Sequence, residues 1–118
     1  MNTKRIAGLQ ERIRQIKEKI LAIEQMRPGS LSEQFNVCGN PNCRCKNPDN
    51  PKKHGPYYQI SYTRKGKSTT EFVRKEMLAN VKKELKAYQE FKKLTDEWID
   101  LSIKIGKLRR QEYKRNKK

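Results

Sequence analysis

One short stretch holds every cysteine and the only histidine of this 118-residue sequence. Cys38, Cys43, Cys45 and His54 follow the spacing C-x4-C-x-C-x8-H. Zinc prefers thiolate and imidazole ligands, and a structural zinc site takes four of them in a tetrahedron. An odd number of cysteines also favours metal ligation over disulfides. The stretch therefore predicts one Zn²⁺ site with these four residues as its ligands.

The spacing departs from the usual C-x2-C knuckle, so it is less specific than a pair of such knuckles. The alternative is three reduced cysteines near a loop, with His54 hydrogen-bonded to a backbone carbonyl. A catalytic zinc would need an open coordination position and a nearby general base. Asp49 is the only acid in the loop, and most iron–sulfur clusters need a fourth thiolate. We therefore expect a structural metal and no enzyme activity.

The loop around these ligands, residues 38–56, is dense in glycine, proline, asparagine and aspartate. Such residues favour tight turns over regular structure, so the loop needs a metal to order it. Residues 30–34 are expected to form a connector or a helical turn. Residues 35–37 are expected to form a brief strand that leads into the cysteines.

A β-hairpin is predicted directly after the loop. Residues 57–63 alternate as a strand, residues 64–66 form a three-residue turn, and residues 67–74 return as the second strand. Thr63 then pairs with Lys67, which gathers the large apolar groups on one face. That face is expected to form a small core from Tyr58, Ile60, Tyr62 and Phe72.

Two helices are predicted on either side of this region, at residues 3–27 and 75–114, with a basic tail at 115–118. The apolar residues of the first helix are spaced by three and four, as in a coiled-coil seam. The second helix matches that period over its C-terminal half, so the two should pack antiparallel. Pro28 and Gly29 are expected to end the first helix. The seams are Ile6, Leu9, Ile13, Ile16, Ile20 and Ile23, and Val81, Leu85, Tyr88, Phe91, Leu94, Trp98, Leu101, Ile105 and Leu108.

The predicted fold is thus α+β and mostly α, a single domain spanning residues 1–118. Only 33% of the residues are hydrophobic and 36% are charged, which argues against a large globular core. Two long antiparallel helices flank the zinc-bound loop and the small hairpin. The second helix is the longer one, so a homodimer through the helices is a further expectation.

The middle of the chain resembles a family of small uncharacterised prokaryotic proteins that are often associated with phages or other mobile elements. The resemblance rests on Arg27-Pro28-Gly29-Ser30, Cys38-Gly39, Cys43-Arg44-Cys45, His54-Gly55-Pro56-Tyr57-Tyr58 and Gly66-Lys67. It implies a Cys/His metal site and a helix–hairpin–helix layout, and it carries no activity with it.

The formal net charge of +16 favours anionic partners, with nucleic acid first, ahead of an anionic membrane surface or an acidic protein. The basic residues cluster in the loop, in the hairpin and in the last helical turns, where the alternative is a solvated, frayed tail. Tyr57 could stack on a base, or pack as core against a helix. The candidate nucleic-acid-binding residues are Arg44, Lys46, Lys52, Lys53, Tyr57, Arg64, Lys65, Lys67, Arg109, Arg110, Lys114 and Arg115.

Two functions follow as hypotheses. The first is a non-catalytic, zinc-stabilised nucleic-acid-binding protein, with DNA favoured over RNA. The second is an adaptor or inhibitor that docks on a nucleoprotein complex through its helices, with Leu85, Tyr88 and Phe91 exposed in the isolated chain. No apolar run is long enough to span a bilayer and no signal peptide is evident, so a cytoplasmic protein is expected.

Overall fold

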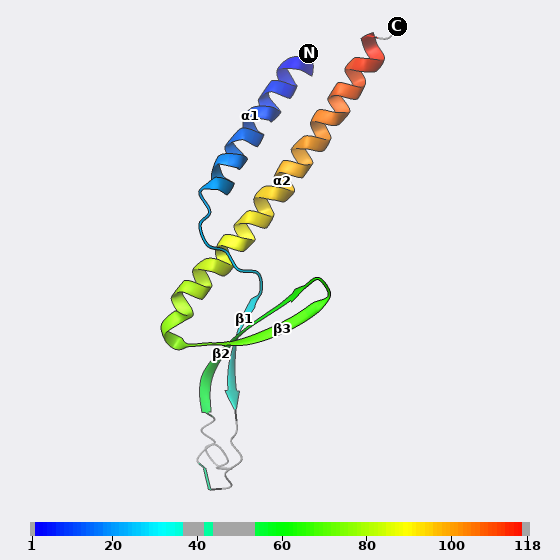
Figure 1. The fold of residues 1–118 in the computed structure, drawn as a ribbon. Helices are drawn as coiled ribbons and strands as arrows, with labels where there is room; N and C mark the ends of the chain where they lie inside the picture. Colours follow the sequence, from blue (N-terminus) through cyan, green and yellow to red (C-terminus); the bar gives the residue numbers. More distant parts are fainter. Residues whose placement is uncertain (1, 37–41, 44–53, 117–118) are drawn as a thin grey trace, which may run out of the picture. The chain divides into compact units, whose positions relative to one another are not determined.

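The computed structural model describes residues 2–36, 42–43 and 54–116 (Figure 1). Two helices and a three-stranded antiparallel sheet make the chain α+β and mostly helical, as predicted. The chain divides into two compact units, Met1–Met26 with Ala87–Lys118 (the helical unit) and Arg27–Lys86 (the sheet unit). In order, the elements are α1 (Asn2–Leu21), β1 (Ser30–Asn36), β2 (His54–Arg64), β3 (Lys67–Val73), a 3-10 turn η2 (Lys75–Met77) and α2 (Leu78–Asn116).

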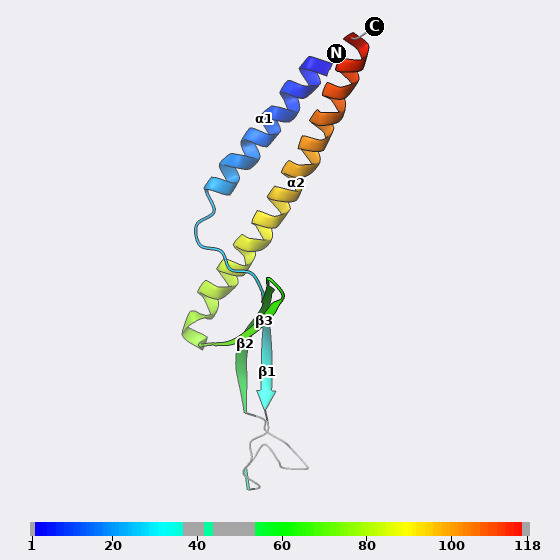
Figure 2. The same ribbon diagram turned by 45° about the vertical axis from the view of Figure 1, so that its right-hand side comes forward.

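In the helical unit, α1 packs antiparallel against the C-terminal part of α2 (Figure 2). The direction follows from two contacts: Asn2 Nδ2 donates to the Leu108 carbonyl at 3.3 Å, and Arg12 pairs with Glu97 at 3.4 Å. The two predicted seams therefore meet. The buried core is Ile13, Ile16, Leu94, Leu101 and Ile105, with Ile6, Leu9, Ile20, Ile23 and Trp98 packed against it.

The first helix ends at Leu21, six residues before the predicted end at residue 27. Ile23 still packs on the helical core, so the apolar period continues past the last helical turn. Farther along, the Arg27 amide donates to the Glu84 carbonyl at 3.1 Å within the sheet unit. Arg27 is therefore outside α1, and Pro28 does not mark the helix end.

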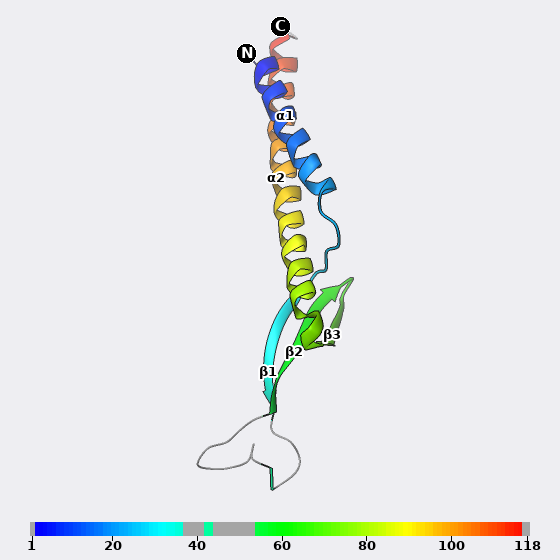
Figure 3. The same ribbon diagram turned by 90° about the vertical axis from the view of Figure 1, so that its left-hand side faces the viewer.

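In the sheet unit, β2 is the central strand, with β1 on one side and β3 on the other (Figure 3). β1 pairs with residues 54–61 of β2 and β3 pairs with residues 58–64, so only residues 58–61 are flanked on both sides. Ile60 lies in this segment and is 0% exposed. It packs with Val81 and Leu85 of α2, and with Leu31 and Val73 of the neighbouring strands.

β1 corrects the prediction of a connector or helical turn at residues 30–34. This strand contributes one apolar side chain, Leu31, to the core around Ile60. Its other residues up to Gln34 are serine, glutamate and glutamine. Glu33 follows Leu31 on the same face, so the strand lacks the second apolar residue that would make the alternation visible in the sequence.

The hairpin register is also shifted by one residue from the prediction. Arg64 pairs with Lys67, and Lys65 and Gly66 form a two-residue turn with φ of +52° and +78°. Two positive φ values in succession are the type I′ geometry, which matches the twist of the flanking strands. The shift moves every side chain of β3 to the other face. Phe72 is therefore 75% exposed and does not join the predicted core.

The helical core predicts a sharp contrast between two isoleucines. Ile16 is 4% exposed and Ile99 is 56% exposed, so Ile16→Ala should cost about 3 kcal/mol and Ile99→Ala less than about 0.5 kcal/mol. Urea unfolding followed by Trp98 fluorescence measures both changes, because Trp98 packs on this core. Equal costs for the two variants would contradict the packing described.

Gly8 and Gly106 lie inside helices, and a Cβ at either position would meet nothing within 4 Å. Gly8→Ala and Gly106→Ala should each stabilise the chain by about 0.5–1 kcal/mol, because alanine loses less backbone entropy in a helix. Thermal unfolding followed by circular dichroism tests this. The matched control is Gly66→Ala, which also has open space but should destabilise, because its φ is positive.

Candidate metal site and nucleic-acid interface

Two of the four predicted metal ligands lie together in the structure. Cys43 Sγ and His54 Nε2 are 3.0 Å apart, although eleven positions separate them in the sequence. Both side chains are half-buried. The other two predicted ligands, Cys38 and Cys45, lie outside the described residues.

His54 is held by its place at the start of β2. It pairs with Asn36 of β1, just beyond a register shift that follows Gln34. Gly55 comes next with φ +136°, and a Cβ there would lie 2.8 Å from the Gln34 carbonyl oxygen. Only glycine allows β1 and β2 to approach so closely. The strand pairing therefore fixes the backbone of His54 independently of any metal.

The two described donors fit a zinc site by chemistry and by position. Thiolate with imidazole is a donor set for zinc and not for magnesium or calcium, which take oxygen ligands. Across a tetrahedral zinc, with bonds of about 2.3 Å to sulfur and 2.0 Å to nitrogen, these donor atoms would lie about 3.5 Å apart. The observed 3.0 Å requires a shift of about half an ångström to admit the ion. Within the described ranges, no three histidine, cysteine or acidic residues form a metal-binding group.

The hairpin turn carries three exposed cations, Arg64, Lys65 and Lys67. Arg64 and Lys67 are direct cross-strand partners, and like charges in that position destabilise a hairpin. Among residues 2–36, 42–43 and 54–116, none of the three forms an ion pair. The turn is thus a concentration of positive charge that the described fold leaves uncompensated.

The metal end and the basic turn lie at opposite ends of β2. His54 begins this strand and Arg64 ends it, so about 33 Å separates them at the rise of an extended strand. A metal at His54 can anchor the strand but does not touch the cations of the turn. The cations predicted near the ligands, Arg44, Lys46, Lys52 and Lys53, lie outside the described residues.

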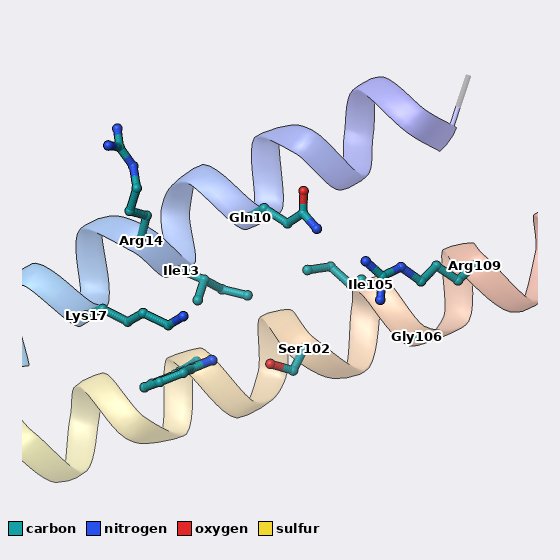
Figure 4. A pocket seen from close by; sticks show the side chains of 9 residues that line it. Gln10, Ile13, Arg14, Lys17, Ser102, Ile105, Gly106 and Arg109 are labelled. Carbon is teal, nitrogen blue, oxygen red and sulfur yellow. The ribbon is translucent and has the colours of Figure 1, made fainter.

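The predicted cations of the last helical turns, Arg109, Arg110, Lys114 and Arg115, are all exposed on α2. Cations at a helix C-terminus are favoured by the helix dipole alone, so their presence there has a structural explanation. Arg109 differs from the others because it lines a groove between the two helices (Figure 4).

That groove has a volume of about 560 Å³ and is lined from both helices. Lys17 of α1 places its ammonium 5.1 Å from the centroid of the Trp98 ring, a cation–π contact. Arg14 points away from α2 (Figure 4) and bonds Glu11, and this hydrogen bond lowers the pKa of the Glu11 carboxyl. Trp98 was predicted in the helical seam, and it packs against the core there. Lys17 was not among the predicted residues, because its spacing in the sequence gives no signal of the contact with Trp98.

Three aromatic residues of the described strands are exposed: Tyr57 at 42%, Phe72 at 75%, and Phe35, next to the register shift of β1, at 52%. Tyr57 lies on the face opposite Tyr58, as the alternation of the strand requires. Phe72 was predicted in the core; the one-residue shift of β3 puts Val73 there instead.

No helix in the described parts of the chain is both long and apolar enough to cross a membrane.

In the comparison with known proteins, the chain matches the model of a protein family. No curated protein and no solved structure matches the chain. The matching family is described as "Domain of unknown function (DUF6788)", and the match covers residues 6–87. That range includes the cysteine stretch and the whole hairpin, whereas the cations from Arg109 onward lie beyond it. Because more than half of the sequence matches, this chain belongs to the DUF6788 family.

Proposed function

We propose that this chain is a non-catalytic, zinc-stabilised nucleic-acid-binding protein, with DNA favoured over RNA. The observation that carries the proposal is the hairpin turn. Arg64 and Lys67 face each other across the strands with Lys65 between them, and no described acid pairs with any of the three. An anionic ligand would relieve this repulsion, and phosphates are the ligand that a chain of net charge +16 attracts most strongly.

The shape of the hairpin supports the same reading. β1 pairs with β2 only as far as Ser61, so residues 62–69 form a two-stranded ribbon with the cations at its tip. A two-stranded ribbon fits the major groove of a duplex or can lie along phosphates. The cations in the last helical turns of α2 add positive charge. The helix dipole alone already accounts for cations at that position, so they support the proposal less strongly than the hairpin does.

Zinc would have a structural role in this protein. Cys43 and His54 would supply two ligands, and Cys38 and Cys45 are proposed as the other two. The ion would close the segment between β1 and β2 at the end of the strand pair where Asn36 meets His54. Its contribution would be folding energy, as in other small zinc-ordered modules.

We propose a non-catalytic protein because the sequence lacks the residue sets that catalysis would need. The sequence offers no set of serine, histidine and acid in a recognisable pattern, no phosphate-binding loop and no carboxylate cluster. A nuclease would need acids to hold its metal, and Asp49 is the only acid of the cysteine stretch.

Metal content gives the first prediction of this proposal. Protein purified without added metal should contain about one zinc per chain, measured by mass spectrometry of the metal. Cys43→Ser and His54→Gln should each lower the zinc content and make thermal unfolding insensitive to chelator. Glu33→Gln, which changes an exposed acid on the neighbouring strand, is the control and should retain zinc. A Cys43→Ser protein with full zinc and unchanged stability in chelator would refute the site.

The basic turn gives the second prediction. Arg64→Gln, Lys65→Asn and Lys67→Gln together should weaken binding to an oligonucleotide and lower the slope of log affinity against log salt by about 2–3, because each lost phosphate contact removes about 0.7–0.9. Fluorescence anisotropy at several salt concentrations measures this. Asparagine is used at position 65 because it tolerates the positive φ of the turn.

The matched control removes the same charge from the same unit. Lys82→Gln, Lys83→Gln and Lys86→Gln change three exposed cations of α2 that the proposal does not use. This variant should keep most of the affinity and most of the salt slope. If the two triple variants lose affinity equally, only net charge matters and the hairpin is no specific interface. If the wild-type chain does not bind at low salt, the proposed function is wrong.

A second candidate is an adaptor that docks on a protein through the helices. Ile99 and Ile103 are exposed and line, with Trp98, a shallow groove of about 470 Å³ on α2. The residues named for this role from the sequence fit it less well, because Leu85 is buried against Ile60, and Tyr88 and Phe91 are half-buried. A second copy of the chain could use the same surface. A stable complex that survives nuclease and is lost in Ile99→Asp would favour this function.

A further inference from the structure

Among the residues of the three described strands, none on the face opposite Ile60, here the outer face, carries a carboxylate. Glu33 and Glu71 are the acidic residues of the three strands, and both lie on the Ile60 face, because Glu33 pairs with Tyr58 and Glu71 pairs with Ile60. The outer face is made of hydroxyl, amide and aromatic side chains, almost all of them exposed. None of these strand residues repels a phosphate backbone.

Two aromatic rings stand on this face as diagonal neighbours. Phe72 pairs directly with Gln59, and Tyr57 lies two residues before Gln59 on the same side of β2. Diagonal positions on adjacent strands are about 7–8 Å apart. Neither ring belongs to the core around Ile60, which uses Val73 from β3 instead. The exposure of Phe72 therefore has no explanation in the packing of the sheet unit.

The polar side chains around the rings bond mainly to one another. Ser61 and Thr70 hydroxyls are 3.1 Å apart, and Gln34 Nε2 donates to Ser32 Oγ at 3.4 Å. These bonds lie along the sheet surface. Gln59, between the two rings, carries an amide that can both donate to and accept from the edge of a base.

Cations flank the rings at both ends of β3. Lys65 lies in the turn before the strand, and Arg74 follows Phe72 by two residues in an extended backbone, with φ −68° and ψ 144°. The alternation of an extended chain places Arg74 on the same side as Phe72. A single exposed ring is ordinary on a protein surface. Two diagonal rings on an acid-free sheet face between cations are typical of sheets that bind single-stranded nucleic acid.

We infer that the outer face binds single-stranded nucleic acid, with two bases stacked on Phe72 and Tyr57 and the backbone held by Arg74 and Lys65. The inference rests on the proposed function and adds its substrate class. Bases of a duplex are stacked on each other and cannot cover these rings, whereas unpaired bases can. Every base has a flat aromatic face that can stack on a ring, so the outer face would bind nucleic acid with little sequence preference.

The test compares a fluorescein-labelled dT20 oligonucleotide with a 20-base-pair duplex by anisotropy. Phe72→Ala should weaken dT20 binding about 5-fold or more, with the salt slope unchanged because no charge is lost. Phe72→Tyr should bind as the wild type does. Phe72→Leu keeps an apolar side chain without a ring and should bind like Phe72→Ala. Duplex affinity should be the same in all four proteins.

The controls separate this inference from the proposed function. Tyr113→Ala removes an exposed aromatic residue of α2 and should leave dT20 affinity unchanged. Circular dichroism checks that the Phe72 variants fold, as expected for a side chain so exposed. If either Phe72→Ala or Phe72→Leu binds dT20 as tightly as the wild type, base stacking on the outer face is wrong. The proposal that the hairpin turn binds phosphates is not affected by that result. Equal losses for dT20 and duplex overturn the single-strand assignment. A wild-type protein that binds neither oligonucleotide overturns both proposals.

Discussion

Burial of Ile60 is the interaction on which the sheet unit depends. Only residues 58–61 of β2 have a strand on each side, and Ile60 is the fully buried side chain within that segment. Val81 and Leu85 cover it from the first turns of α2. This single contact decides which face of the sheet is covered, and by alternation it decides which side chains remain in solvent. The acid-free outer face is a consequence of it, whereas the ribbon with its basic tip follows from β1 ending its pairing at Ser61.

The described fold keeps three kinds of chemistry apart. The Cys43–His54 pair lies at the start of β2, the basic turn lies at the end of β2, and the exposed rings lie on the outer face between them. A zinc ion at the first place would therefore act on the other two only through the strand. On this account, metal loss should affect nucleic-acid binding through stability of the sheet unit and not through direct contact with the ligand.

Periodicity was enough to predict the helical unit, because a seam of residues three and four apart has one efficient way to be buried. It predicted which residues of α1 and α2 meet, but not that α1 ends at Leu21, because Ile23 continues the apolar pattern outside the helix. The sheet was harder to predict from the sequence than the helical unit. β1 offers a single core residue, Leu31, and the hairpin register depends on whether Lys65 adopts a positive φ. A lysine gives no sign of that, so the sequence favoured the register that buried Phe72. Cys43 and His54 lie together. The ligand set stays a prediction, because Cys38 and Cys45 lie outside the described residues.

The central claim is that nucleic acid binds the sheet unit through the hairpin turn and the outer face. Amide chemical shifts of ¹⁵N-labelled protein, followed during titration with dT20, test this most directly. The account predicts shifts at residues 64–67 and around Tyr57, Gln59 and Phe72, with the amides of α1 unaffected. Shifts confined to the helices, or no shifts at low salt, would contradict it.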